Sequence, residues 1–349
     1  MRKGDRQKPF FLNVSLTHPH DPYAISPDLY DQYEGVDIPL PSVRIPQDEQ
    51  DSHSTRLLKC IDLWNNPIPK EAVLRARRAY FGACTYVDNQ IGRLMKVLKD
   101  CQLDKNTIII FSGDHGDMLG ERSLWYKMSF FEMSTRVPLI INYPRRFRPR
   151  RVQESVSTMD LLPTLVDLVG GRIDPLVPLD GVSFYPALLG RAVKDEVFGE
   201  YMGEGTISPL VMIRRGQWKY VTSLVDPPQL FNLEDDPKEL TDLAKSNDPK
   251  VAAVSAQFAA EARAKWDLKA IHQEVLQSQR QRRLCWSALT QGRFETWDYE
   301  PPRDGSARYI RSNVPLDDLE LRARFPPVDA LGRPIRTNHP HGIAGAKGE

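Results

Sequence analysis

The stretch Asn106-Thr-Ile-Ile-Ile-Phe-Ser-Gly-Asp-His-Gly-Asp117 decides the fold of this chain. Its consecutive bulky apolar residues predict a strand that is covered on both faces, as the strands of a parallel sheet are. Open α/β sheets bind their ligands outside the carboxyl ends of the strands, which is where the polar end of this stretch would lie. The stretch therefore predicts an α/β fold with a site at the end of one strand.

The segments on either side continue the alternation of strands and helices. Residues 9–16 are apolar and predict a first buried strand, which leads into a polar loop with His18 and His20. Apolar residues at steps of three and four predict a helix from about Lys70 to Asp100. Turn signals and periodicity predict the remaining elements: a strand at 137–143, a helix at 161–169, short antiparallel strands at 197–198, 210–213 and 218–222, and helices at 248–265 and 268–289.

Composition excludes several classes of protein. The 349 residues include 47 Lys and Arg against 46 Asp and Glu, a formal net charge of +1, which gives no support to a nucleic-acid or membrane-surface role. The four cysteines, at 60, 84, 101 and 285, lack metal-site spacing and fit a reducing compartment, so we expect a cytoplasmic protein. No apolar run is long enough to cross a bilayer, so we expect no membrane partner.

Four residues in the two polar loops could carry chemistry. Asp114 and His115 could both face a divalent cation, although a turn stabilised by Gly113 and Gly116 would use the same residues. Lys127 could meet an anionic oxygen, or its side chain could simply extend from a loop into solvent. His20 could donate to a tetrahedral anion or protonate a leaving group, and a solvated loop histidine is the alternative.

Several strings resemble the type I sulfatases of the alkaline phosphatase superfamily. Phe10–Tyr23 resembles their strand and loop with a sulfate-contacting His, and Thr107–Glu121 resembles their metal-binding segment. Further strings resemble sulfatases in general or choline sulfatases in particular: Arg136–Ile141, Met159–Leu165, Gly120–Met128, Tyr201–Gly205, Leu230–Pro237, Ser278–Arg283, Trp297–Tyr299, Leu316–Glu320 and Ala323–Pro326. The tail strings are not shared by general sulfatases, so the resemblance is strongest to the choline sulfatases.

This resemblance implies roles for individual residues. Asp114 and His115 are expected to bind a divalent cation, Ca²⁺ in the first place, with Mn²⁺ or Mg²⁺ as alternatives. His20 and Lys127 are expected to hold sulfate oxygens and to stabilise the departing alkoxide. A quaternary ammonium cannot donate a hydrogen bond, so its recognition needs a carboxylate and aromatic faces. Glu204 is the expected carboxylate, and Asp318 in the tail is expected to reach the choline pocket of a neighbouring subunit in a homo-oligomer.

The sequence also departs from the family. Sulfatases form their formylglycine nucleophile from a Cys/Ser-x-Pro-x-Arg motif, and no such motif occurs in the 349 residues. The paired aspartates that complete the family's metal site are absent as well. We therefore expect a C-terminal part of a choline sulfatase that lacks half of the catalytic centre and is inactive alone, with exposed apolar sheet edges.

The resemblance also implies an architecture. Residues 1–175 are expected to form the C-terminal portion of the sulfatase catalytic domain, an incomplete, mostly parallel sheet flanked by helices. Residues 176–265 are expected to form a small antiparallel subdomain, and residues 266–349 a choline-sulfatase-type helix and extended tail. Two other functions remain open: another hydrolase of the superfamily, such as a phosphonate monoester hydrolase or an arylsulfatase, and a non-catalytic remnant that binds choline or serves assembly.

Overall fold

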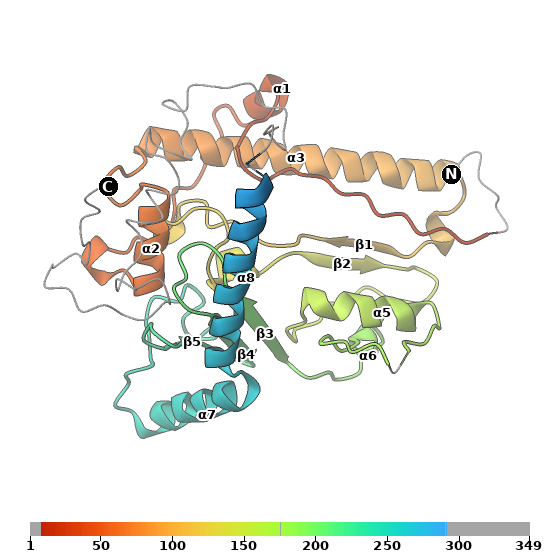
Figure 1. The fold of residues 1–349 in the computed structure, drawn as a ribbon. Helices are drawn as coiled ribbons and strands as arrows, with labels where there is room; N and C mark the ends of the chain where they lie inside the picture. Colours follow the sequence, from red (N-terminus) through yellow and green to blue (C-terminus); the bar gives the residue numbers. More distant parts are fainter. Residues whose placement is uncertain (1–7, 175, 290, 292–349) are drawn as a thin grey trace, which may run out of the picture.

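The structure is a computed structural model that describes residues 8–174, 176–289 and 291. Figure 1 shows a layered arrangement in which the long helix α3 (Lys70–Asp100) lies over a two-stranded ribbon of β1 (Ile109–Ser112) and β2 (Leu139–Asn142). The short helices α5 (Leu161–Leu168) and α6 (Tyr185–Leu188) lie on the other side of this ribbon. The remaining short elements before the second sheet are α1 (Pro27–Asp31), α2 (Ser52–Cys60), α4 (Glu132–Thr135) and the 3-10 turns Gln47–Glu49, Asp104–Asn106, Glu121–Ser123 and Thr158–Asp160.

The helix expected from Lys70 to Asp100 is confirmed as α3. Its inward face carries small residues, so that α1 can approach closely. A β-carbon at Gly82 would lie 3.0 Å from the carbonyl oxygen of Leu29 in α1. The small residues of this face therefore allow α1, which lies in the segment before α2, to pack closely against α3.

The expected first strand is wrong. Residues 9–16 form no strand, and most of their apolar side chains are exposed, with Phe11 at 83% and Leu16 partly buried. The expected mostly parallel sheet is not confirmed either, because β1 and β2 pair antiparallel with Ile110 opposite Ile141. A short apolar run cannot by itself distinguish a parallel from an antiparallel partner, since that choice depends on the path of the chain between the strands.

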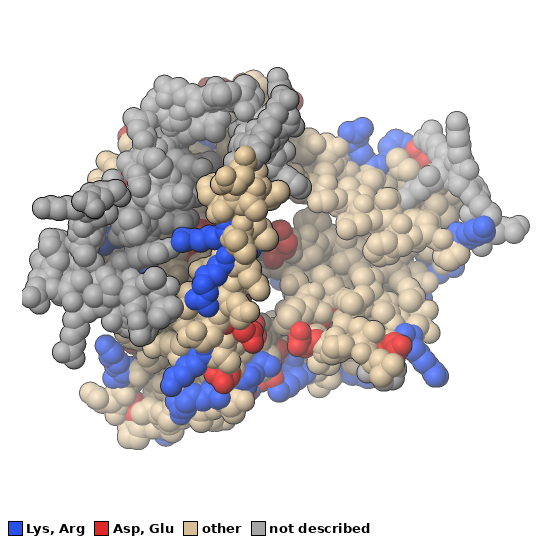
Figure 2. All heavy atoms as spheres, viewed as in Figure 1, with Lys and Arg blue, Asp and Glu red and all other residues tan. Residues whose placement is uncertain are grey.

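Apolar side chains remain exposed over this part of the molecule. Ile140 in β2 is 60% exposed, and Figure 2 shows few charged side chains over the region that Figure 1 assigns to β1, β2 and α5. The other large apolar side chains exposed in the same stretches of chain are Phe10, Phe11, Leu12, Val14, Leu162 and Val169. This set with Ile140 is called the open apolar surface below.

A second sheet follows where the short strand signals predicted antiparallel strands, and it has a fourth strand, at residues 229–232, that was not predicted from the sequence. Its strands β3 (Glu196–Tyr201), β4 (Leu210–Arg215), β5 (Trp218–Ser223) and β6 (Gln229–Asn232) pair antiparallel in chain order. One face buries Ile213, Tyr220 and Leu230 against Phe258 and Trp266. This core attaches the sheet to the helix that follows it.

Two helices end the described part of the chain at the residues that the sequence indicated. Helix α7 (Pro249–Lys265) begins after Asp248, whose side chain accepts a hydrogen bond from the Lys250 amide at 2.8 Å. Helix α8 (Leu268–Leu289) follows directly. No helix among the described residues is long and apolar enough to cross a membrane. The domain boundaries at 175 and 265 stay predictions.

Candidate functional site

Lys127 and His20 lie together although 107 positions separate them in the sequence. The Nζ of Lys127 is 2.6 Å from the Nε2 of His20. The Nδ1 of His20 faces two acceptors of Asp21, the carbonyl oxygen at 2.7 Å and the carboxylate at 3.1 Å. Nδ1 therefore carries the imidazole proton, and Nε2 accepts from the ammonium group. The result is a half-buried lysine whose ammonium group is held beside the His20 ring.

Asp114 and His115 follow β1 and extend this group. The ring centroids of His115 and His20 are 5.7 Å apart. The Nδ1 of His115 lies 2.8 Å from the Gly116 carbonyl, which places the ring proton on Nδ1 and leaves a lone pair on Nε2. The Asp114 carboxylate is 91% exposed and lies 3.8 Å from that Nε2. We call His20, Asp114, His115 and Lys127 the anion site.

Two of the anion-site residues could hold a metal ion. A carboxylate oxygen and a free imidazole nitrogen on one turn are suitable donors for a divalent cation. Two protein ligands are fewer than such an ion needs, and among the described residues no group of three His, Cys, Asp or Glu side chains comes together for one. The donor set thus fits part of a metal site.

Ser134 and Gly116 hold the two loops of the anion site against each other. The sequence indicated Gly116 as a turn residue and gave no role to Ser134. The buried Ser134 accepts a hydrogen bond from the Gly116 amide at 2.7 Å, and its hydroxyl donates to the Lys127 carbonyl. A β-carbon at Gly116 would lie 2.0 Å from the Met133 carbonyl oxygen. The approach of these loops therefore requires glycine at 116.

Asp117 fixes the start of the loop that carries Lys127. One carboxylate oxygen accepts from the Leu119 amide at 2.9 Å and the Tyr126 amide at 3.2 Å, and the other accepts from the Tyr23 hydroxyl at 2.9 Å. Burial raises the pKa of Asp117 and is also the main cause that raises the pKa of Tyr23. No role was assigned to Asp117 from the sequence, although it lies in the stretch that follows β1. Its partner Tyr23 is 94 positions away, so no local pattern indicates the contact.

Glu121 anchors the middle of the same loop, and sequence reasoning gave it no separate role. Its carboxylate accepts from the backbone amides of Ser42 and Val43 at 2.8 and 2.7 Å. The Arg77 guanidinium lies 3.7 Å from the other carboxylate oxygen and donates to the Leu119 carbonyl at 2.8 Å. Helix α3 and the segment before α2 thus fix the loop from two sides.

Glu204 lies after β3 in a different loop and is exposed. Its contacts join it to Tyr201, whose hydroxyl donates to the Glu204 carboxylate and carbonyl, each at 3.2 Å. Burial is the main cause that raises the pKa of Tyr201, followed by the neighbouring carboxylate. Within the described residues Glu204 forms no hydrogen bond to the anion site. Asp318 lies outside the described residues.

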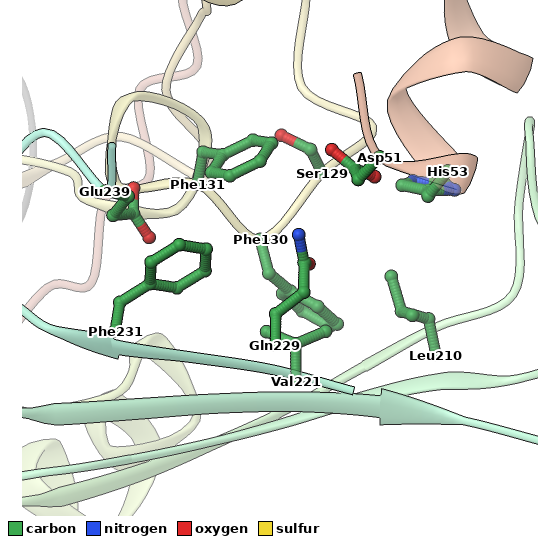
Figure 3. Close-up of a pocket in the computed structure, with 10 residues that line it drawn as sticks. All are labelled: Asp51, His53, Ser129, Phe130, Phe131, Leu210, Val221, Gln229, Phe231 and Glu239. Atoms are coloured by element: carbon green, nitrogen blue, oxygen red, sulfur yellow. The ribbon is translucent and has the colours of Figure 1, made fainter. Parts of the chain in front are cut away.

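A buried ion-pair network supports the segment that follows Lys127. Lys219 in β5 is 1% exposed, and its ammonium group lies 2.8 Å from Glu239 and 2.7 Å from Glu132, and donates to the Phe130 carbonyl at 2.7 Å. Burial raises the pKa of Glu239. Figure 3 shows Ser129 and Phe131 on one side of a small pocket and Val221 and Gln229 of the four-stranded sheet on the other, with the Phe130 side chain beside the sheet residues. The pocket volume is about 10 Å³, room for a single water, so this region is packed support and not a ligand site.

Comparisons with known families give consistent matches along the chain. The family model described as Sulfatase matches residues 2–171, and the model described as N-sulphoglucosamine sulphohydrolase, C-terminal, matches residues 120–266. The model described as Choline sulfatase enzyme C terminal matches residues 273–325. The three matches overlap or follow one another along most of the sequence.

Individual relatives agree with these models. A choline-sulfatase of Rhizobium meliloti (strain 1021) is 42% identical over 325 residues, which are 92% of this chain and 63% of the relative. Arylsulfatase K of Gallus gallus is 34% identical over 260 residues, 67% of this chain and 47% of the relative. The crystal structure of a phosphonate monoester hydrolase of Agrobacterium radiobacter has a TM-score of 0.63 at 28% identity, covering 78% of this chain and 58% of that chain.

The chain spans 63% and 47% of the length of these two curated relatives. The strings that resembled sulfatases are those that the family models cover, and the structural neighbour shares the α/β architecture. The chain belongs to the sulfatase family.

Proposed function

We propose that this chain is the part of a choline-sulfatase-type sulfuric ester hydrolase that receives choline sulfate, and that it does not hydrolyse the ester alone. The observation that carries the proposal is the 2.6 Å contact of Lys127 with His20, at a strand end beside His115. The 42% identity to a choline-sulfatase over 92% of the chain supports the substrate class. The whole enzyme converts choline sulfate and water into choline and sulfate.

The sulfate end of the substrate would meet Lys127 and His20. A lysine ammonium is a compact point charge that suits an anionic oxygen. The imidazole of His20 keeps this ammonium in place, and a histidine at this position could give a proton to the departing alkoxide. Both groups are half-buried, so their charge is screened less than it would be on an open surface.

Asp114 and His115 would hold a divalent cation, Ca²⁺ in the first place, with Mn²⁺ or Mg²⁺ as alternatives. The His115 tautomer supports this, because the Nδ1 contact with Gly116 leaves Nε2 free to bind an ion. A bound cation would polarise the sulfate ester oxygens. The sequence contains no Cys/Ser-x-Pro-x-Arg motif, so no step through formylglycine is derived from this chain.

The choline end would meet Glu204. Its neighbour Tyr201 offers a ring beside the carboxylate, which is the combination that a quaternary ammonium requires. Asp318 is proposed to complete this pocket in a neighbouring subunit of a homo-oligomer joined through the tail. We also infer a cytoplasmic location, which the low number of cysteines, four without the spacing of a disulfide scaffold, supports.

A second candidate is hydrolysis of a phosphonate monoester. The TM-score of 0.63 to a phosphonate monoester hydrolase favours it, and both substrate classes carry an anionic tetrahedral group. The Glu204–Tyr201 pair favours choline sulfate over this alternative. A phosphonate ester without an ammonium group would form no favourable ionic or cation–π contact with this pair.

Calorimetric titration of the purified chain in the presence of Ca²⁺ tests the proposal. We expect choline sulfate to bind more tightly than phenyl methylphosphonate, and Glu204→Gln to weaken choline sulfate alone. A parallel assay for released sulfate should show no turnover, and binding without turnover is also what a non-catalytic remnant would give. Equal binding of both esters, unchanged by Glu204→Gln, would contradict the choline assignment, and sulfate release would contradict the inactivity of the chain.

A further inference from the structure

His53 in α2 contacts both loops that the proposed function assigns to the substrate. Its side chain is buried, at 6% exposure. The Nε2 atom lies 2.6 Å from the Met128 carbonyl oxygen, and Nδ1 lies 3.2 Å from the Gly205 carbonyl oxygen. Met128 directly follows Lys127, and Gly205 directly follows Glu204. A neutral imidazole carries one N–H, so the shorter contact, to Met128, is its hydrogen bond, and the ring packs against the Gly205 carbonyl. One ring thus touches both the sulfate-end loop and the choline-end loop.

The imidazole is held in this place by its own helix. Asp51 caps α2 by accepting from the Ser54 amide at 2.9 Å, and Figure 3 shows the ring beside Asp51 at the start of the helix. The Tyr201 ring packs edge-on against it at 5.9 Å between centroids. Gly205 has φ +76°, and a β-carbon there would meet the Leu57 side chain at 2.7 Å. The helix, the ring and the loop backbone are therefore in close contact at Gly205.

The Gly205 loop has a second attachment to the same helix. Arg56 donates from Nε to the Gly205 carbonyl and forms a bidentate ion pair with Asp226. This attachment fixes the Gly205 loop to α2. His53 differs from it in lying at hydrogen-bond distance from the backbone on both sides, at Met128 beside Lys127 and at Gly205 beside Glu204.

We propose that His53 is a positioning residue that couples the two ends of the substrate site, so that sulfate at Lys127 and a quaternary ammonium at Glu204 strengthen each other's binding. The inference rests on the proposed function. Sulfate that orders the Lys127 loop would also order the Glu204 loop through the His53 ring. Choline binding would then carry a smaller conformational-entropy cost, because its loop is already ordered. Such a coupling is reciprocal, because the two ligands share one equilibrium.

The test is calorimetry of the full chain with choline, with sulfate, and with choline at saturating sulfate. In the unchanged protein we expect sulfate to tighten choline binding by about tenfold. His53→Phe keeps a ring but removes the N–H donor to Met128 and changes the contact with Gly205, and we expect the tightening to fall below about twofold while each ligand alone binds within about threefold of the unchanged protein. His272→Phe, at another buried histidine in α8, is the matched control and should keep the full tightening.

A second variant keeps the test decisive if His53→Phe does not melt cooperatively. His53→Gln retains a donor for the Met128 carbonyl and so favours folding, yet its reach to Gly205 is lost, and we expect a tightening below about threefold. Full tightening in either folded variant would overturn the role of His53. If choline and sulfate both bind the unchanged protein without affecting each other, the inference fails and the proposed function stands. If neither ligand binds the unchanged protein, the proposed function fails and the inference fails with it.

Discussion

Lys219 is the residue on which the support of the anion site depends most. It is buried, and its ammonium group contacts two carboxylates and the Phe130 carbonyl. Burying a charge is costly unless it is paired, so the network is stable only while its partners stay together. The network therefore fixes the segment from Phe130 to Glu132, which follows Lys127 in the chain and supports its position.

We expect Lys219→Met to lower the free energy of unfolding by about 3–5 kcal/mol, because it leaves Glu239 buried without its counter-charge. Urea unfolding measures this. Lys96→Met is the matched control, because Lys96 pairs with Asp100 on the exposed face of α3, and its removal should cost under about 1 kcal/mol. Equal losses in the two variants would show that the buried network does not stabilise the chain.

At the scale of elements, the turn after β1 depends on Gly116. We expect Gly116→Ala to separate this turn from α4 and to weaken sulfate binding by at least about tenfold, because its β-carbon would lie 2.0 Å from the Met133 carbonyl oxygen. Calorimetry with sulfate measures the effect. Gly92→Ala in α3 meets nothing within 4 Å and should instead stabilise the helix by about 0.5–1 kcal/mol. Unchanged sulfate binding in Gly116→Ala would show that the anion site does not depend on the close packing of this turn against α4.

Helix α2 makes stability depend on pH through His53. Burial is the main cause that lowers the pKa of His53, with Arg56 lowering it further and Asp51 and the two carbonyl contacts opposing the shift. Above about pH 6.5 the ring is neutral in both the folded and the unfolded chain. As the pH falls below this value, His53 is protonated in the unfolded chain but stays neutral in the folded chain. The free energy of unfolding therefore decreases.

The measurement is urea unfolding at several pH values between 7.5 and 5 for the unchanged chain and for His53→Gln. We expect the unchanged chain to lose stability faster as the pH falls, and the difference between the two chains to narrow toward pH 5. This difference isolates His53 from buried carboxyls such as Asp117 and Glu239, which both chains share. Parallel curves would contradict the assignment.

The helices were predictable because their signals are local. The periodicity of α3, the Asp248 cap and the Pro249 start of α7 lie within each segment, and these helices have the expected bounds. The path of β2 was not predictable, because antiparallel pairing with β1 depends on how the intervening loop turns. The expected strand at 9–16 failed for a related reason, since an apolar run becomes a strand only where a partner strand lies beside it.

The candidate site was predictable only in part. His20, Asp114, His115 and Lys127 follow from the polar strand ends and the family resemblance, and the structure brings them together, although their roles stay predictions. The residues that hold them there could not be found from the sequence. His53, for example, lies 75 positions from Met128 and 152 from Gly205, and no local pattern reports such contacts.

At the scale of the whole molecule, the open apolar surface should make the chain associate. Large exposed apolar patches mark interaction sites or promote aggregation. We expect the purified chain to bind an apolar dye strongly and to elute as large species at high concentration. The double variant Phe11→Ser, Leu12→Ser should reduce both signals.

Val36→Ser is the control for this prediction, because Val36 is 50% exposed but lies outside the open apolar surface. It should leave dye binding unchanged. A chain that is monodisperse and does not bind the dye would show that this surface is not available in solution.

The claim that the loops of His20, Asp114, His115 and Lys127 form one anion-receiving site is tested most directly by a calorimetric sulfate titration of Lys127→Met beside Lys96→Met. Lys127 is half-buried against His20, whereas Lys96 lies on the exposed face of α3, so both variants remove one positive charge in different settings. We predict that Lys127→Met weakens sulfate binding by at least about tenfold, since it removes a charge-assisted hydrogen bond, and that Lys96→Met leaves it within about twofold. Equal sulfate affinity in the two variants would contradict the account.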